Sequence, residues 1–238
     1  MSTASFGASL AVALAAVAGA ARAADAAPPR AAPRKDNPVW MARHAALLER
    51  AKKGADVVFL GDSLTQGWEG PDGAEVWKKH FEPLKAANFG AGGDRTEHVL
   101  WRVTEGQELR GLKPKVIVVQ VGGSNLAANS ADEIIDGITA LVRELGRQKP
   151  ESRVLLLGLL PRGAKANDKF RDKIKEVNKG LAGLDDGKKV RYLDAGANFL
   201  DKEGDLVEEA MPDGLHPSAK GYTLWAEAIK GALEEVLK

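Results

Sequence analysis

Hydrophobic and polar positions alternate along the chain in two patterns. Continuous apolar runs with β-forming residues cover residues 56–60, 115–121, 153–160 and 190–194, and a weaker run covers 84–88. Segments between them carry apolar residues at helical spacing. Strands that are apolar throughout are buried on both faces, and helix-length connections favour parallel neighbours. The pattern predicts one doubly wound α/β domain of three layers, closed by a helix over 219–237.

The N-terminal segment has a different pattern. No charged side chain occurs before Arg22, and an Ala-rich apolar run leads into an A-x-A motif at residues 21–23. We interpret residues 1–23 as a signal peptide cleaved before Ala24, which predicts export to the periplasm or the exterior. Because no Lys or Arg precedes the run, a low-complexity alanine tail remains the alternative. The run is too short and too rich in Ala and Gly to predict a membrane span.

Residues 24–38 carry four prolines among alanines and charged side chains. This composition is typical of a linker, because it cannot bury an apolar face. The folded domain is therefore expected over residues 39–238.

Charge and cysteine content exclude several functions. The 34 basic and 33 acidic side chains give a net charge of +1, so no nucleic-acid partner is expected. The chain has no cysteine, which excludes a disulfide scaffold, thiolate metal sites and a cysteine nucleophile.

A candidate nucleophile follows the first predicted strand, in the sequence Gly-Asp-Ser-Leu-Thr at residues 61–65. Ser63 stands at the start of a predicted helix, where its own N–H is available to stabilise negative charge. The alternative is structural, because Asp62 or Ser63 could serve only as a helix N-cap. The sequence is not the G-x-S-x-G elbow of the α/β-hydrolases.

Four histidines are available as a base. His44 and His80 lie in charged segments and are expected to be solvated surface groups, whereas His98 is expected to pack within a helix. His216 lies in a loop punctuated by Pro and Gly before the last helix. Asp213, three residues earlier, is close enough to accept the imidazole Nδ1–H and to fix its tautomer.

Two glycine-containing turns follow the next strands. Residues 88–96 contain three glycines in four positions, which allows backbone amides to approach a substrate closely, and residues 122–125 form a second turn. Each of these two segments could instead be only a tight turn with no contact to a substrate. A dinucleotide-binding fingerprint would need glycine where Arg95 stands. A nucleotide-binding module is also disfavoured because no P-loop lysine follows.

Together these motifs resemble the SGNH (GDSL) hydrolases. They are Gly-Asp-Ser-Leu at 61–64, an Asn-x-Gly-x-x-Gly-Asp block at 88–94 and an Asp-x-x-His-Pro block at 213–217. The stretches NFGAGGDRTEHVLWR, LKPKVIVVQVG and VLLLGLLPRG are similar to the catalytic subunits of intracellular platelet-activating-factor acetylhydrolase. The resemblance spans residues 57–237. It implies a flavodoxin-like α/β/α sandwich with a five-stranded parallel sheet, a homodimer, and hydrolysis of short-acyl esters of a glycan or lipid without metal or cofactor.

By motif position, the resemblance implies that Ser63 is the nucleophile, His216 the base and Asp213 its orienting carboxylate. The backbone amides of Ser63 and Gly93 would donate hydrogen bonds to the oxyanion.

Four further residues are candidates for substrate contacts: Asp62, Leu64, Asn125 and Arg162. For Arg162, which lies in a Pro-Arg-Gly turn, a solvated loop charge is an equal alternative.

One position departs from the family pattern. The third block usually places Asn, as an oxyanion donor, where this chain has Ser124. Three explanations are open: the Ser124 hydroxyl donates, Asn125 substitutes, or the site is impaired. Losing one donor costs a factor of about 10² to 10³ in kcat, so an active but slow esterase is expected. A catalytically impaired carbohydrate- or lipid-binding protein on the same fold is the alternative.

Overall fold

A parallel β-sheet forms the middle layer of the structure, a computed structural model that describes residues 30–238. The predicted signal peptide and residues 24–29 of the predicted linker lie outside the described residues, so both stay predictions. The sheet consists of β1 (Val57–Gly61), β2 (Ala86–Gly90), β3 (Val116–Gln120), β4 (Arg153–Leu157) and β5 (Val190–Leu193).

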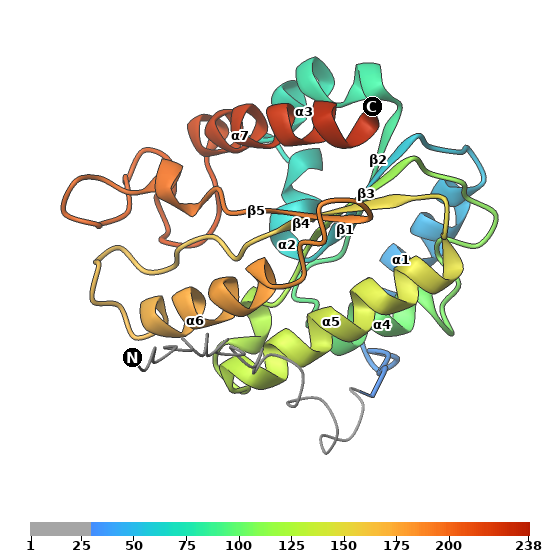
Figure 1. Cartoon of the computed structure of the whole chain (residues 1–238), viewed down its shortest axis with the longest axis horizontal. Coiled ribbons are helices and arrows are strands. Elements are labelled where there is room, and N and C mark those ends of the chain that lie inside the picture. Colours follow the sequence, from blue (N-terminus) through green and yellow to red (C-terminus); the bar gives the residue numbers. More distant parts are fainter. Residues whose placement is uncertain (1–29) are drawn as a thin grey trace, which may run out of the picture.

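Helices cover both faces of this sheet (Figure 1). They are α1 (Pro38–Ala51), α2 (Ser63–Gln66), α3 (Ala74–His80), α4 (Thr96–Val103), α5 (Ala131–Gln148), α6 (Arg171–Ala182) and α7 (Ala219–Leu237). Short 3-10 turns are η1 (Gly67–Glu69), η2 (Glu82–Leu84), η3 (Gly123–Asn125) and η4 (Gly196–Phe199). Within residues 30–238, no helix combines the length and the apolar character needed to cross a membrane.

The strand order is β2-β1-β3-β4-β5, and every neighbouring pair is parallel. This is the flavodoxin-like order, in which the chain reverses direction across the sheet between β1 and β3. The predicted three-layer fold, its five strands and its closing helix are confirmed. The weak strand expected at 84–88 is β2, displaced by two residues toward the C-terminus.

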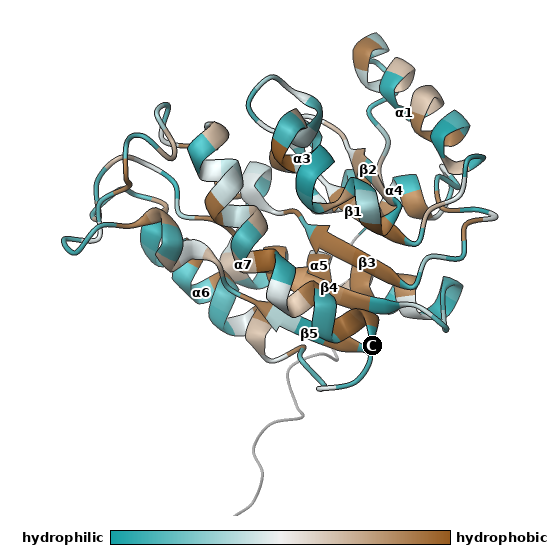
Figure 2. Cartoon of the chain, turned by 90° about the horizontal axis from the view of Figure 1, so that it is seen from above, coloured by the Kyte–Doolittle hydropathy of each residue, from teal (hydrophilic) through white to brown (hydrophobic). Residues whose placement is uncertain are grey.

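Two apolar layers hold the helices to the sheet. Val58 and Leu60 of β1 point toward α4, α5 and α6, whereas Val57 and Phe59 point toward α3 and α7. Figure 2 shows the apolar strands β3 and β4 in the interior and hydrophilic positions along the outer surfaces of the helices. Burial on both faces is confirmed for β1, β3 and nearly all of β4, whereas β5, at the edge of the sheet, is only half-buried.

The segment before α1 lies against the domain. The Ala32 N–H donates to Glu97 O at the start of α4 (3.0 Å), and Asn37 caps α1 by accepting from the Trp40 N–H (3.0 Å). Pro38 occupies the first helical position, where its missing N–H costs nothing. Residues 30–37, part of the segment expected to be a linker, are thus in contact with the domain.

A buried ionic cluster joins α4 to the ends of two strands. The fully buried Arg102 donates to Asp94 Oδ2 (2.8 Å) and Glu108 Oε2 (2.7 Å), which are also fully buried. It also donates to Gly61 O (2.8 Å) and Phe89 O (2.9 Å), the carbonyls near the carboxyl ends of β1 and β2. Burial alone would lower the pKa of Arg102, but Glu108 and Asp94 raise it. The guanidinium therefore stays charged.

His44 belongs to this cluster, which corrects one prediction. We expected a solvated surface group, but His44 is buried and its Nδ1 lies 2.7 Å from Glu108 Oε1. Its ring stacks on Trp40 and contacts the edge of Trp101. Its partner is 64 positions away, so the charged residues near His44 along the chain gave no signal of this contact.

Replacing Arg102 with Met should destabilise the protein by about 3 to 5 kcal/mol, because two buried carboxylates lose their shared cation. Urea unfolding followed by tryptophan fluorescence measures this change. Arg147→Met, on the exposed side of α5, is the matched control and should change stability by less than about 0.5 kcal/mol. Equal effects of the two variants would contradict the importance of the cluster.

Candidate active site

Three turns meet where β1, β2 and β3 end at the carboxyl edge of the sheet. Ser63 follows β1, Gly93 follows β2 and Ser124 follows β3. Because the strand order reverses between β1 and β3, this edge is where ligands bind in such folds.

Ser63, His216 and Asp213 form a connected chain of polar contacts. Ser63 Oγ lies 3.4 Å from His216 Nε2, and His216 Nδ1 lies 2.7 Å from Asp213 Oδ2. The serine comes from the first turn of α2, whereas the other two come from the loop before α7, 153 positions later for His216. The side chains of His216 and Asp213 are about half exposed (48% and 54%), so the site opens directly to solvent.

The loop before α7 arranges Asp213 and His216 locally. Asp213 Oδ1 accepts from the backbone N–H of Leu215 (2.9 Å) and of His216 (2.7 Å), leaving Oδ2 for the imidazole. Partial burial raises the pKa of Asp213, but the hydrogen bonds from His216 and Leu215 outweigh it and hold that pKa below its usual value. The carboxylate is therefore ionised at neutral pH and fixes the ring.

Asp62 and Leu64 hold the turn that carries Ser63. Asp62 is the N-cap of α2, and its Oδ1 accepts from the Leu64 N–H (3.0 Å). Leu64 packs in the apolar layer beneath α7, and its carbonyl accepts from Tyr222 Oη (3.0 Å). Both side chains are buried beneath Ser63, so their predicted contacts with substrate stay a prediction.

The β2 strand supports the same turn from the side. Asn88 Nδ2 donates to Thr65 O (2.6 Å), and Asn88 Oδ1 accepts from the Gly90 N–H (2.8 Å). A side chain on Gly90 would collide with the backbone of Gln66. The Asn-x-Gly spacing therefore brings β2 against α2.

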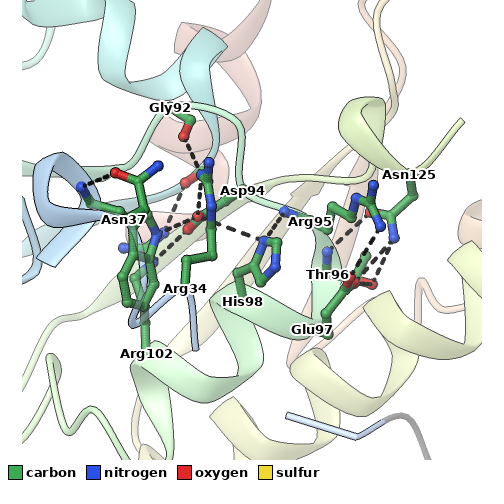
Figure 3. Close-up of polar contacts among 12 residues, drawn as sticks. Arg34, Asn37, Gly92, Asp94, Arg95, Thr96, Glu97, His98, Arg102 and Asn125 are labelled. Atoms are coloured by element: carbon green, nitrogen blue, oxygen red, sulfur yellow. Dashed lines mark hydrogen bonds and ion pairs between the residues drawn. The ribbon is translucent and has the colours of Figure 1, made fainter. Parts of the chain in front are cut away.

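The loop after β2 presents an unpaired amide. Gly93 has a positive φ of 71°, which favours glycine, and its N–H donates to no other residue within 30–238. Both ends of Gly92 are held: its N–H donates to Gln66 Oε1 (2.7 Å), and its carbonyl accepts from Arg34 Nη1 (2.8 Å). Figure 3 shows Arg34 beside Gly92 and Asp94.

The turn after β3 separates the roles of Ser124 and Asn125. Asn125 is buried. Its Nδ2 donates to Glu97 (3.2 Å), and its Oδ1 accepts from the Thr96 N–H (Figure 3). Its Nδ2 also donates to Asn129 Oδ1 (3.1 Å). Its amide therefore joins η3 to α4. The half-buried Ser124 has no hydrogen-bond partner within the described part of the chain, so its hydroxyl is available.

A shallow hollow of about 450 Å³ opens beside Ser63 and is lined by Ser63, Gln66, Gly67, Glu69, Gly70 and His216. Glu69 forms ion pairs with Arg43 and Arg50. Partial burial raises the pKa of Glu69, but Arg43 and Arg50 have the larger combined effect and hold that pKa below its usual value. The wall of the hollow therefore carries an ionised carboxylate. Residues 30–238 contain no cluster of three or more His, Asp or Glu side chains suited to a metal ion.

Arg162 is not among the residues that line this hollow. Its guanidinium lies 4.9 Å from the ring centroid of Phe170. The backbone of its turn is closer to the site, because the Gly163 N–H donates to Gly214 O (2.9 Å) beside the histidine loop. A direct contact of Arg162 with substrate stays a prediction.

Sequence reasoning missed Gln66 and Arg34. Gln66 lies one helical turn after Ser63, and that spacing was the available signal for it. Arg34 had none, because it belongs to a Pro- and Ala-rich segment and contacts a loop 58 positions away.

Comparisons with known proteins agree with this geometry. The sequence profile described as "GDSL-like Lipase/Acylhydrolase family" matches residues 59–224. Human platelet-activating factor acetylhydrolase IB subunit alpha1 is 40% identical over 200 residues, covering 83% of this chain and 84% of the human protein.

Solved structures show the same fold at lower identity. A GDSL-like lipase from Bacteroides thetaiotaomicron superposes with a TM-score of 0.64 at 22% identity, covering 83% of this chain and 96% of that one. A variant of an acetyl-xylooligosaccharide esterase from Geobacillus stearmophilus gives 0.60 at 18% identity, covering 77% and 95%.

Burial raises the pKa of Asp62 to about 7; the Leu64 N–H and His216 lower it, whereas Asp94 raises it. The folded protein therefore keeps a proton that the unfolded chain releases above about pH 4, and this group disfavours folding increasingly as pH rises toward 7. The Asp62→Asn variant carries no titratable proton at this position, so it avoids this loss. Its unfolding free energy relative to that of wild type should therefore rise by roughly 2 to 3 kcal/mol when the pH is raised from 5 to 8.

Urea unfolding at the two pH values measures this difference. The matched control is Asp172→Asn, which removes an almost fully exposed carboxylate on α6. It should change the unfolding free energy by the same amount at pH 5 and at pH 8. If Asp62→Asn also changed stability equally at pH 5 and pH 8, the raised pKa would be wrong.

Proposed function

The chain belongs to the GDSL-like lipase/acylhydrolase family and is a carboxylic ester hydrolase, and we propose that it acts as a serine esterase through Ser63, His216 and Asp213. One observation carries the assignment of residues: the contact of Ser63 Oγ with His216 Nε2, backed by the shorter contact of His216 Nδ1 with Asp213.

In the proposed acylation step, Ser63 Oγ attacks the ester carbonyl and transfers its proton to His216 Nε2. Asp213 keeps the Nδ1–H tautomer and stabilises the imidazolium. The 3.4 Å separation of Oγ and Nε2 is long for a hydrogen bond, and such contacts tighten when substrate binds. The imidazolium then gives its proton to the departing alcohol. A water molecule, deprotonated by His216, hydrolyses the acyl-enzyme and regenerates Ser63.

The developing oxyanion needs donors in a fixed position. We propose the N–H groups of Ser63 and Gly93, with the Ser124 hydroxyl as the third donor. Ser63 is the first residue of α2, so its N–H has no partner within the helix. Ser124 is preferred to Asn125, because both Asn125 amide hydrogens have acceptors elsewhere. The η3 turn is beside the nucleophile turn, since a Cβ on Gly123 would lie 3.8 Å from Asp62 Oδ2.

We propose a short-acyl ester, such as the acetyl ester of a glycan, as substrate. The residues that line the hollow beside Ser63 have polar side chains, such as Gln66 and Glu69, or are glycines. Such groups suit the hydroxyls of a sugar better than an aliphatic chain. The Geobacillus structural neighbour is named as an esterase of acetyl-xylooligosaccharides. Export by the predicted signal peptide would bring the enzyme to extracellular glycans, and a homodimer remains part of the proposal.

The alternative, an impaired carbohydrate- or lipid-binding protein, predicts no turnover. Purified protein should hydrolyse p-nitrophenyl acetate faster than longer esters up to about C10, and should release acetate from acetylated sugars. Ser63→Ala should reduce kcat by a factor of about 10⁴ or more, because the nucleophile is lost.

Ser130→Ala is the matched control, because it removes a hydroxyl at the exposed N-cap of α5. It should leave kcat unchanged. Equal rates for wild type and Ser63→Ala would refute the serine mechanism, and absent turnover in both would favour the binding protein.

Ser124→Asn should raise kcat on p-nitrophenyl acetate by up to about 10²-fold, because an amide donor replaces a rotating hydroxyl in the proposed oxyanion site. Ser124→Ala should lower it. Steady-state kinetics with both variants test the alignment of this turn, and an unchanged or lower rate for Ser124→Asn would contradict it.

A further inference from the structure

We infer that Arg34, in the segment before α1, is a positioning residue that orients and polarises the Gly93 N–H for oxyanion binding. The inference rests on the proposed function, in which that N–H is a donor. Arg34 Nη1 donates to Gly92 O at 2.8 Å, and Gly92 O belongs to the same peptide group as the Gly93 N–H.

The planarity of that peptide group transmits the contact. A peptide group is planar, and none within 30–238 is cis, so the Gly93 N–H points opposite to the Gly92 C=O. Whatever fixes the carbonyl therefore fixes the N–H. The Asp94 N–H donates to Ala91 O (3.2 Å) and closes the turn, but that bond does not involve the peptide group between Gly92 and Gly93. Both residues lack side chains, and Gly93 has a positive φ, so this central peptide group would otherwise rotate easily.

The charge of Arg34 also acts on this peptide group. A hydrogen bond from a cation to the carbonyl is charge-assisted and increases the polarity of the N–H on the other side. The guanidinium lies against the loop: a Cβ on Gly93 would be 3.2 Å from Arg34 Nη1. Arg34 is only partly exposed (26% of its side chain), which limits screening by water.

Arg34 is itself held in place. Its Nη1 lies 3.7 Å from Asp94 Oδ1, and Asp94 is fixed by Arg102 and by Trp40 Nε1 (2.6 Å). Its backbone carbonyl accepts from the Asn37 N–H (2.9 Å), just before α1 begins. With Gln66 holding the Gly92 N–H, the loop is fixed from α2 on one side and from the N-terminal segment on the other.

The test compares four full-length proteins on p-nitrophenyl acetate: wild type, Arg34→Ala, Arg34→Lys and Arg30→Ala. Arg34→Ala should lower kcat by about tenfold with little change in KM, which is less than the 10² to 10³ expected for complete loss of a donor. Arg34→Lys, which keeps a cationic donor, should recover part of kcat. Arg30→Ala removes an exposed arginine from the same segment and should match wild type.

A trifluoromethyl ketone provides a second readout, because its adduct with a serine carries an oxyanion. Its affinity should fall in Arg34→Ala by the same factor as kcat, while the thermal midpoint stays close to wild type. A loss of thermal stability without a matching loss of inhibitor affinity would overturn the inference.

Ser63→Ala, measured in parallel, separates the two possible failures. If Ser63→Ala keeps wild-type activity, the proposed function itself is wrong. If Ser63→Ala is inactive but Arg34→Ala keeps wild-type kcat, or if Arg30→Ala loses as much as Arg34→Ala, only the role of Arg34 is wrong.

Discussion

The guanidinium of Arg102 is the constraint on which the candidate site depends. It joins Gly61 and Phe89, the carbonyls from which the nucleophile turn and the glycine loop depart, and it also holds Asp94 within that loop. One buried cation thereby sets the separation of two elements that, in the proposed mechanism, act on the same ester carbonyl. Such a cation is costly to bury, and the two carboxylates and two carbonyls around it offset that cost.

The rest of the candidate site is open to solvent, so the positions of its side chains depend on a rigid backbone beneath them. His216 and Asp213 are half exposed, and the hollow beside Ser63 is shallow. By contrast, the groups beneath the turns are buried, and each is hydrogen-bonded: Asp62 under Ser63, Asn88 between β2 and α2, and Asn125 between η3 and α4. The residues proposed to react therefore lie at the surface, and the buried residues beneath them fix their geometry.

The sequence predicts features that depend on local pattern, such as the five apolar strands and the helix before the C-terminus. It also predicts which side chains share the sheet edge, because parallel strands place their carboxyl ends together. Local sequence patterns do not predict contacts between segments that are far apart in the chain. The burial of His44 depends on Glu108, the Asn125 amide is taken up by Glu97, and Arg34 contacts Gly92; none of these pairs is adjacent in sequence or governed by a periodic pattern.

The 153 positions between Ser63 and His216 have a consequence during synthesis. The ribosome synthesises the turn with Ser63, the glycine loop and all five strands before the histidine loop, and α7 follows that loop. A nascent chain at that stage carries the proposed nucleophile, Ser63, without its proposed base, His216. In the proposed mechanism, hydrolysis therefore requires that the histidine loop has been synthesised and has folded against the nucleophile turn.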